Sequence, residues 1–409
     1  MLKTIQTILL LVVFSLGSAQ DSIDHDKIKE DLYQILNDIS KYYPYLEDKN
    51  VDLNCLLSYY ENQIPNIKTE EETVLFFEYL LDEFYDSHLT LNTNRNSSYR
   101  LYSPIYVSIK SNKAIISNIW QTQLENLNHD LIGAEVVKIN NEDFEIAIEQ
   151  FPTYCSNKKS KPVKEWISNK ILSGRYNQPR ILTLRTVQNQ IIEFNLEELK
   201  ERKTDELLTS RKENNIGIIR INNSLGNNNL INEFDKTLKK LKDTKGLIID
   251  LRNTVDGGNS YVARGIMGRF IKEKKPYQKH QILEKYNGSD IVERSWTEYV
   301  SPRGVQYQKP VVVLVGRWTG SMGEGLAIGF EGMGRAEIVG SEMERLAGEM
   351  NGFLFKNQAY GYRLSVAKLY HVNGVPREKY IPTNYVNQTT THKDEVLVKG
   401  MDLLNKKAK

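Results

Sequence analysis

Residues 311–328 read VVVLVGRWTGSMGEGLAI. The five apolar residues at the start predict a strand covered on both faces, the glycine-rich part predicts a turn, and the last residues begin a helix. This order places the hydroxyl of Ser321 at the carboxyl end of the strand, where N–H groups of the helix terminus can stabilise a developing oxyanion. Ser321 is therefore a candidate nucleophile, although a serine that only caps the helix explains the bare pattern equally well.

A second turn of this form precedes the first. Residues 247–258, LIIDLRNTVDGG, again join an apolar run to glycines. Two such turns lie at one edge of a parallel sheet, so the backbone around Gly257 can supply an oxyanion donor. Apolar runs at 216–221, 247–251 and 311–315, with helical patterns near 230–241 and 261–271, predict an α/β domain.

The chain before residue 216 differs in character. Residues 26–86 have helical periodicity, with the capping-box pair Thr69 and Glu72 opening the clearest helix. Short alternating segments between 103 and 196 predict a β-rich middle domain, and polar residues 200–215 predict an exposed linker. We expect a helical domain at 23–92, a β-rich domain at 103–198 and an α/β domain at 214–405.

Composition limits the classes of function. The 409 residues are 40% hydrophobic and 26% charged, which suits a multidomain globular protein and argues against global disorder or a multispan membrane protein. A formal net charge of +2 supplies no field for nucleic acid, so we expect no nucleic-acid partner.

The first residues predict export. Lys3, an apolar run from Ile8 to Phe14, and small residues ending at Ala19 form a signal-peptide pattern over residues 1–19, too short for a membrane span. We expect cleavage after Ala19, no stable membrane span afterwards, and a periplasmic or extracellular protein. In such a compartment Cys55 and Cys155 form either a disulfide or two separate buried thiols. No His or Cys cluster has metal-ligand spacing, so no metal or cofactor is expected.

A nucleophilic serine needs a base, and sequence spacing does not choose one. Ser87 and His88 follow a predicted helix, and from the residues alone they more simply terminate it. His371 follows an apparent strand at 364–370 and reads as a surface histidine at a sheet edge. A nearby lysine is the third option. An α/β-hydrolase esterase ranks last, because Thr319 holds the place of the first glycine in its nucleophile elbow.

The two turns together resemble those of the C-terminal processing, or tail-specific, serine peptidases. The family's strand-Asp-Leu-Arg-glycine turn is similar to 250–258, and its Thr-Ala-Ser-Ala-Ser-Glu turn is similar to 319–324, in the same order. The likeness continues into 334–340 and covers about Ile216 to Tyr385. Residues 131–140 resemble part of a peptide-binding PDZ module.

This family divides by its base. One branch uses a lysine in a Tyr-Gly-Lys-Gly-like turn, and Leu346 holds that place here. The branch resembling tricorn protease carries a Ser-His pair before the core, which Ser87 and His88 resemble, and this reverses the preference for simple helix termination. The branch's glutamate stretch, Glu-Gly-Val-Gly-x-x-Pro-Asp, shares its Glu and Pro with residues 377–383, which makes Glu378 a candidate.

The resemblance thus implies a complete set of roles. His88 would take the Ser321 proton, and Ser87 with Glu378 would orient His88. The N–H groups of Met322 and Gly257 would hold the oxyanion. The turn at 250–258 departs from the compact glycine turn of the family, and Gly323 replaces a common serine.

The sequence predicts a multidomain α+β protein with a helical N-terminal domain, a PDZ-like β-rich domain and an α/β peptidase core of the tail-specific, ClpP/crotonase-like type. The predicted function is that of an exported, cofactor-free serine endopeptidase acting on polypeptides, with a substrate C-terminus as one means of recognition. The alternative is a catalytically silent protein that binds peptide or an apolar ligand on the same fold.

Overall fold

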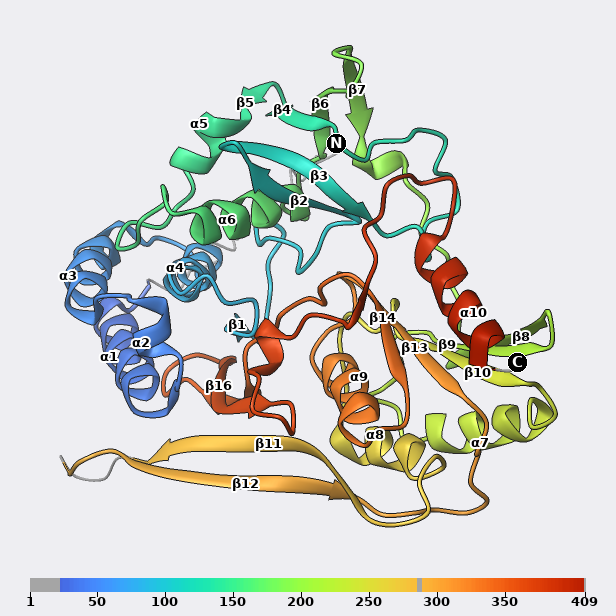
Figure 1. The fold of residues 1–409 in the computed structure, drawn as a ribbon. Helices are drawn as coiled ribbons and strands as arrows, with labels where there is room; N and C mark the ends of the chain where they lie inside the picture. The colour runs from blue at the N-terminus through green and yellow to red at the C-terminus, as the bar shows by residue number, and fades with distance from the viewer. Residues whose placement is uncertain (1–22, 285–288, 408–409) are drawn as a thin grey trace, which may run out of the picture.

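The computed structural model describes residues 23–284 and 289–407 of the chain. It has three sheets and a helical N-terminal region, and so it is a multidomain α+β protein (Figure 1). The predicted signal peptide, residues 1–19, lies outside the described residues. Within the described part, no helix is long and apolar enough to cross a membrane.

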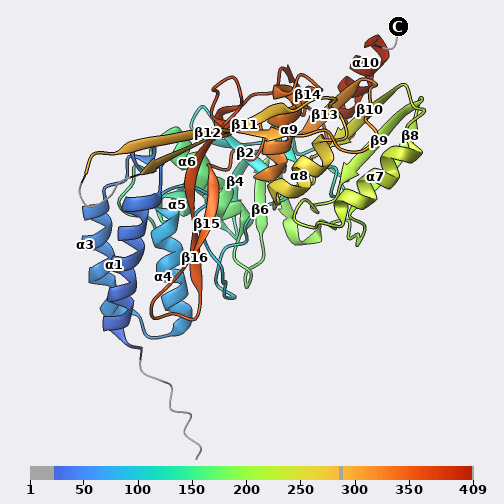
Figure 2. The ribbon, with the colours of Figure 1, turned by 90° about the horizontal axis from the view of Figure 1, so that it is seen from below.

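Four helices open the described chain. They are α1 (His25–Tyr42), α2 (Leu46–Lys49), α3 (Leu53–Gln63) and α4 (Glu70–Asp82). The predicted apolar face of α1 is buried, and the predicted capping box forms at the start of α4, where Thr69 and Glu72 satisfy each other's backbone N–H groups. Figure 2 shows α1, α3 and α4 side by side, and their apolar faces pack with Phe355, Tyr362 and Leu364 from the far end of the chain.

The middle of the chain is β-rich, as predicted. Its sheet has the strand order β2-β3-β4-β6-β7, with β5 added at β4. The elements are β2 (Ile105–Lys110), β3 (Lys113–Ile119), β4 (Glu135–Ile139), β5 (Glu142–Asp143), α5 (Phe144–Glu149), α6 (Lys161–Ser173), β6 (Ile181–Arg185) and β7 (Ile191–Asn195).

The core sheet has the order β17-β14-β13-β10-β9-β8 and is parallel except for the β8–β9 pair. Its strands are β8 (Leu208–Glu213), β9 (Ile216–Ile221), β10 (Gly246–Asp250), β13 (Val311–Val315), β14 (Glu337–Gly340) and β17 (Asn384–Tyr385). Residues 200–215 are mostly exposed, as expected, but 208–213 are not a linker, because they form β8 and gain backbone hydrogen bonds by pairing with β9.

Helices cover both faces of this sheet, as continuous apolar strands require. One face packs against α7 (Leu230–Lys240), α8 (Ser260–Met267) and α9 (Met322–Gly332), and the other against α10 (Glu395–Lys407) (Figure 1). Because β10 and β13 are parallel neighbours, their carboxyl ends meet at one edge of the sheet. That edge carries both glycine-rich turns.

A third sheet joins the two ends of the chain. It consists of β1 (Thr90–Leu91), β11 (Lys275–Glu284), β12 (Val292–Val300), β15 (Glu349–Leu354) and β16 (Gly361–Tyr370). The short strand β1 pairs antiparallel with β16. Since β1 begins two residues after His88, this pairing brings the predicted base from the helical region onto the core. The long β11–β12 hairpin was not predicted from the sequence.

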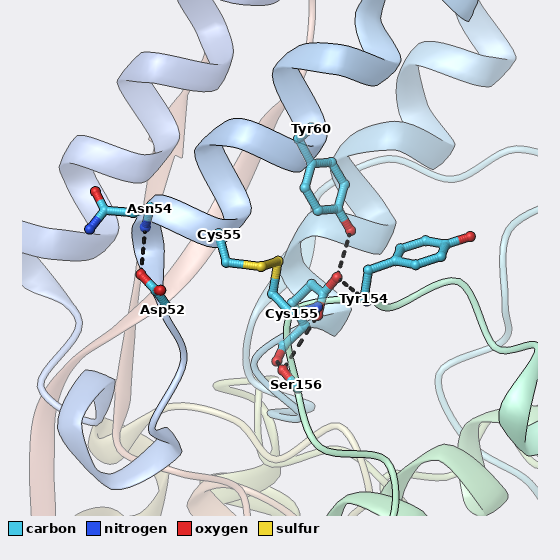
Figure 3. The surroundings of a disulfide bond; sticks show 8 residues. Asp52, Asn54, Cys55, Tyr60, Tyr154, Cys155 and Ser156 are labelled. Atoms are coloured by element: carbon cyan, nitrogen blue, oxygen red, sulfur yellow. Dashed lines mark hydrogen bonds between the residues drawn. A yellow bond between two sulfur atoms is a disulfide. The ribbon is translucent and has the colours of Figure 1, made fainter.

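Cys55 and Cys155 form a disulfide, which resolves the two alternatives left by the sequence (Figure 3). It ties α3 to the segment after α5. Beside it, the Glu83 carboxylate accepts hydrogen bonds from the N–H groups of Tyr154 (2.6 Å) and Cys155 (3.1 Å). The disulfide to α3 and the buried Glu83 carboxylate at the end of α4 together fix the segment after α5 to the helical region.

Candidate active site

Ser321 occupies the turn between β13 and α9, as the sequence predicted. Its backbone has φ 48° and ψ −110°, a strained conformation for a residue with a side chain. Its N–H donates to the Glu324 carboxylate at 3.0 Å. Such strain is typical of functional sites, where surrounding contacts hold a side chain in one direction.

The second turn packs directly on this serine. Gly257 has φ 66°, and a Cβ there would overlap Ser321 Cβ and lie 2.9 Å from the Met322 nitrogen. Residues Thr254 and Thr319 form a parallel bridge that fixes the two turns together. The turns therefore meet at one sheet edge, and only a glycine fits at position 257.

The two predicted oxyanion donors differ in their present bonding. Met322 is the first residue of α9, and its N–H has no acceptor among residues 23–284 and 289–407. The Gly257 N–H donates to Thr254 O at 3.0 Å. One donor is thus available at the helix terminus, and the other is engaged inside its own turn.

His88 is 3% exposed, and its ring is oriented by the backbone of a distant loop. Its Nδ1 lies 2.9 Å from Ala347 O. A carbonyl oxygen only accepts, so Nδ1 carries the proton and Nε2 is left with its lone pair. Nε2 has no hydrogen-bond partner in the described part of the chain. Burial lowers the pKa of His88 to about 4, with Arg377 adding to the effect. The imidazole is neutral at pH 7, as a general base must be.

The residues around His88 divide into contacting and non-contacting groups. Asp86 accepts the His88 N–H at 2.9 Å and the Tyr43 hydroxyl at 2.7 Å, so it holds the turn that presents the histidine. No motif in the sequence marked Asp86 for this position. The exposed Ser87 instead accepts a hydrogen bond from the Trp166 indole at 3.2 Å. Among described residues, no hydrogen bond joins Ser87 or Ser321 to the His88 ring.

Glu378 lies in a short 3₁₀ turn, Arg377–Lys379, with its Oε2 buried and unpartnered among the described residues. Burial raises the pKa of Glu378. The pKa of Tyr45 is also raised, first by burial and then by the negative charge of Glu378. The neighbouring Arg377 donates to Leu346 O (3.1 Å) and Gly348 O (2.9 Å). Glu378 is thus beside the loop that orients His88, without a hydrogen bond to that ring in the part of the chain described.

Glu324 joins the nucleophile turn to this loop. Besides the Ser321 N–H, its fully buried carboxyl accepts the N–H groups of Arg345 (2.9 Å) and Leu346 (3.3 Å). Burial raises the pKa of Glu324 to about 7 despite these bonds and the guanidinium of Arg377, 3.9 Å away. The motif contained Glu324, but no sequence signal gave it this linking position.

A pocket of about 270 Å³ opens beside the loop. It borders the His88 turn at Ser87, the nucleophile turn at Trp318, and α6 at Trp166. Glu344 also lines it, and burial raises the pKa of that carboxyl well above its usual range. The pocket therefore lies where the helical region, the β-rich sheet and the core meet.

His371, the alternative base, is not at the surface. It is 5% exposed, its Nδ1 accepts the Asn373 N–H at 3.1 Å, and its Nε2 lies 3.4 Å from Glu331. The expectation of an exposed edge histidine was wrong, because the His371 ring stacks on Tyr380 and lies beside Glu331 of α9. Over the described ranges, no group of three or more His, Cys, Asp or Glu residues could hold a metal ion.

The strand–turn–helix site has the form expected of a serine peptidase, and family models assign the chain to that class. A family model for peptidase family S41 matches residues 215–386, and one for the tricorn protease C1 domain matches residues 24–82. The chain belongs to the S41 family of tail-specific peptidases, and its substrates are accordingly polypeptides.

Solved structures support the fold. Mature CPAF is 12% identical with a TM-score of 0.63, covering 94% of this chain and 96% of its own. The photosystem II D1 C-terminal processing protease is 13% identical with a TM-score of 0.54, covering 91% of this chain and 96% of its own. No curated protein sequence matches the chain significantly.

Proposed function

We propose that this chain is an exported endopeptidase that cleaves polypeptides with Ser321 as nucleophile and His88 as general base. The observation that carries the proposal is the close packing of Gly257 on Ser321, which has a strained backbone and is followed directly by the available N–H of Met322. A serine held in this way matches the geometry of acyl transfer, with an oxyanion donor beside the attacking hydroxyl.

His88 fits the base role by its protonation state. With Nδ1–H donating to Ala347 O, Nε2 can accept the Ser321 proton and later return it to the leaving amine. Glu378 would polarise this site from beside the 345–348 loop, and Ser87 would act from the pocket side of the turn. In catalysis the His88 ring and Ser321 would approach each other, since apo catalytic hydrogen bonds commonly tighten only with substrate.

Export is supported by two features. The signal-peptide pattern at 1–19 predicts a mature chain that starts at Gln20. The Cys55–Cys155 disulfide suits an oxidising compartment such as the periplasm or the extracellular medium. N-terminal sequencing of the protein recovered from the medium or periplasm checks this, and an intact N-terminus in the cytoplasmic fraction would refute it.

The second candidate function is a silent peptide-binding protein. It is favoured by the engaged Gly257 N–H and by the lack of a Ser321–His88 hydrogen bond among the described residues. In this case the serine would be a helix cap and would not react.

A fluorophosphonate probe separates the two candidates. Intact-mass analysis should show one adduct on the mature protein, none on Ser321→Ala and a strongly reduced amount on His88→Ala. Folded wild type without an adduct would establish the silent protein. Labelling that persists in His88→Ala and disappears in His371→Ala would transfer the base role to His371.

A further inference from the structure

The edge of the β-rich sheet that faces α6 is already occupied by this chain. Strand β2 pairs with β3 on one side, and α6 runs along the other side (Figure 1). PDZ domains bind peptides by adding an extended strand to such an edge and capturing the C-terminal carboxylate with backbone N–H groups. Edge N–H and C=O groups must be free for this.

Asn169 of α6 takes the place of an added strand. Its side-chain oxygen accepts the Val107 N–H at 2.9 Å, and its side-chain nitrogen donates to Val107 O at 2.9 Å. A residue on a neighbouring antiparallel strand exchanges the same two bonds. The amide also donates to Glu165 O at 2.8 Å, which fixes it on the helix.

The neighbouring edge groups are satisfied in the same way. The Glu165 carboxylate accepts the Ile109 N–H at 3.0 Å and the Tyr106 hydroxyl at 2.9 Å. At the start of the strand, the Ile105 N–H donates to Ser103 Oγ at 3.3 Å. The N–H groups of 105, 107 and 109, which alternate along the edge, are therefore all bonded internally.

The approach to β2 also offers no carboxylate site. Pro104, immediately before the strand, has no N–H to donate. The carbonyl oxygens of Ser103 and Pro104 accept bonds from the Trp318 indole (3.0 Å) and the Trp120 N–H (2.9 Å). A nest of successive free N–H groups cannot form here, because Pro104 has no N–H and the N–H of Ile105 is bonded to Ser103, which is itself tied to the core by Trp318.

We propose that α6 is a built-in ligand of the PDZ-like edge, and that this peptidase therefore takes internal polypeptide segments without reading a C-terminal carboxylate. The cleavage part rests on the proposed function. The occupied edge stands independently of it, since Asn169 and Glu165 lie outside the catalytic residues. Moving the Asn169 and Glu165 side chains away would break their hydrogen bonds to the backbone of Val107 and Ile109. The edge therefore stays closed while the fold is intact.

The first experiment uses random-sequence short peptides prepared once as free acids and once as C-terminal amides. Capture of a carboxylate by charge-assisted hydrogen bonds gives about a tenfold or larger preference for the acids. We expect kcat/KM values for the two pools within about threefold of each other. A larger preference for the acids overturns the inference.

Binding of the same pools to Ser321→Ala separates the two proposals. If neither pool is cleaved by wild type, the proposed function fails, and the acid-to-amide binding ratio on Ser321→Ala still decides the inference. Equal retention, or retention of neither pool, agrees with a closed edge, whereas selective retention of the acids contradicts it.

Hydrogen exchange tests the closed edge directly. The amides of residues 105–110 should be protected in the free protein, and Asn169→Ala should raise the exchange of the Val107 amide at least about tenfold because its acceptor is lost. Asn128→Ala, at an exposed asparagine in the same β-rich part, is the control and should leave the exchange unchanged. Rapid exchange of this segment in wild type would overturn the inference, as would protection that increases only when acid peptides are added.

Discussion

Replacing Glu324 with glutamine should change how the stability of the protein depends on pH. The carboxyl is fully buried, and its pKa is raised from 4.5 to about 7 with burial as the first cause. A carboxyl whose pKa is higher in the folded state is bound more tightly to its proton there. Its contribution to stability is complete below about pH 4.5 and is lost as the pH rises through 7.

The size of the effect follows from the shift. From 4.5 to about 7, at about 1.4 kcal/mol per pH unit, the ionised carboxyl costs roughly 3 kcal/mol of folding free energy at high pH. Between about pH 5 and about pH 8.5, roughly 2 to 3 kcal/mol of this should appear. Glutamine does not titrate, so the stability of wild type minus that of Glu324→Gln should fall by that amount over this interval.

The assay is urea unfolding at both pH values, followed by tryptophan fluorescence. Glu125→Gln, at an exposed position, is the control and should give a difference that is constant with pH. The absolute difference at one pH is not diagnostic, because glutamine also brings an NH₂ donor toward the N–H groups of Ser321, Arg345 and Leu346. A Glu324→Gln difference that is also constant with pH would refute the reasoning.

Three further predictions concern the site and its supports. With His88 as base, kcat/KM should stay constant down to about pH 5 and fall near pH 4, because protonation removes the Nε2 lone pair; a limb near the ordinary histidine value of 6.5 would contradict a buried ring. Gly257→Ala should abolish most activity, because the added Cβ would overlap Ser321 Cβ. Gly334→Ala is the control: it has the same φ of 66° in open space, and it should cost only about 1 kcal/mol of backbone strain. Equal activities of the two variants would show that the contact with Ser321 does not matter. Cys55→Ser should lower unfolding free energy by about 4 to 5 kcal/mol, since the disulfide spans a separation of 100 residues, and calorimetry of this variant against wild type under oxidising conditions checks it.

Local patterns in the sequence predicted the elements whose periodicity and caps are strong. The face formed by Ile28, Leu32 and Ile35 identified α1, and the apolar run at 311–315 identified β13 with its bounds. These features depend on residues close in sequence, so one stretch of chain contains the whole signal. Residues 208–213 were assigned to a linker because they are polar and exposed and show no apolar strand pattern. They form the edge strand β8 through backbone pairing with β9, which the side chains do not signal.

The site was predictable where a motif marks it. Ser321 and Gly257 lie in two glycine-rich turns, and both meet at the sheet edge as expected. The contacts of Asp86, Glu324 and Ala347 were not predictable, because each depends on loops far apart in the chain that only tertiary packing brings together. The roles of Ser87 and Glu378 stay predictions.

The β1–β16 pairing has a consequence for when the protein can become active. His88 is held on the core by a strand that pairs with residues 362 and 363, near the end of the chain. At roughly 5 to 20 residues per second, synthesis of the intervening chain takes about 15 to 60 seconds. A nascent chain already contains its proposed base during that time, yet the base has no strand to dock on. The proposed base therefore cannot dock before β16 has been made, and a chain truncated before β16 should remain without activity.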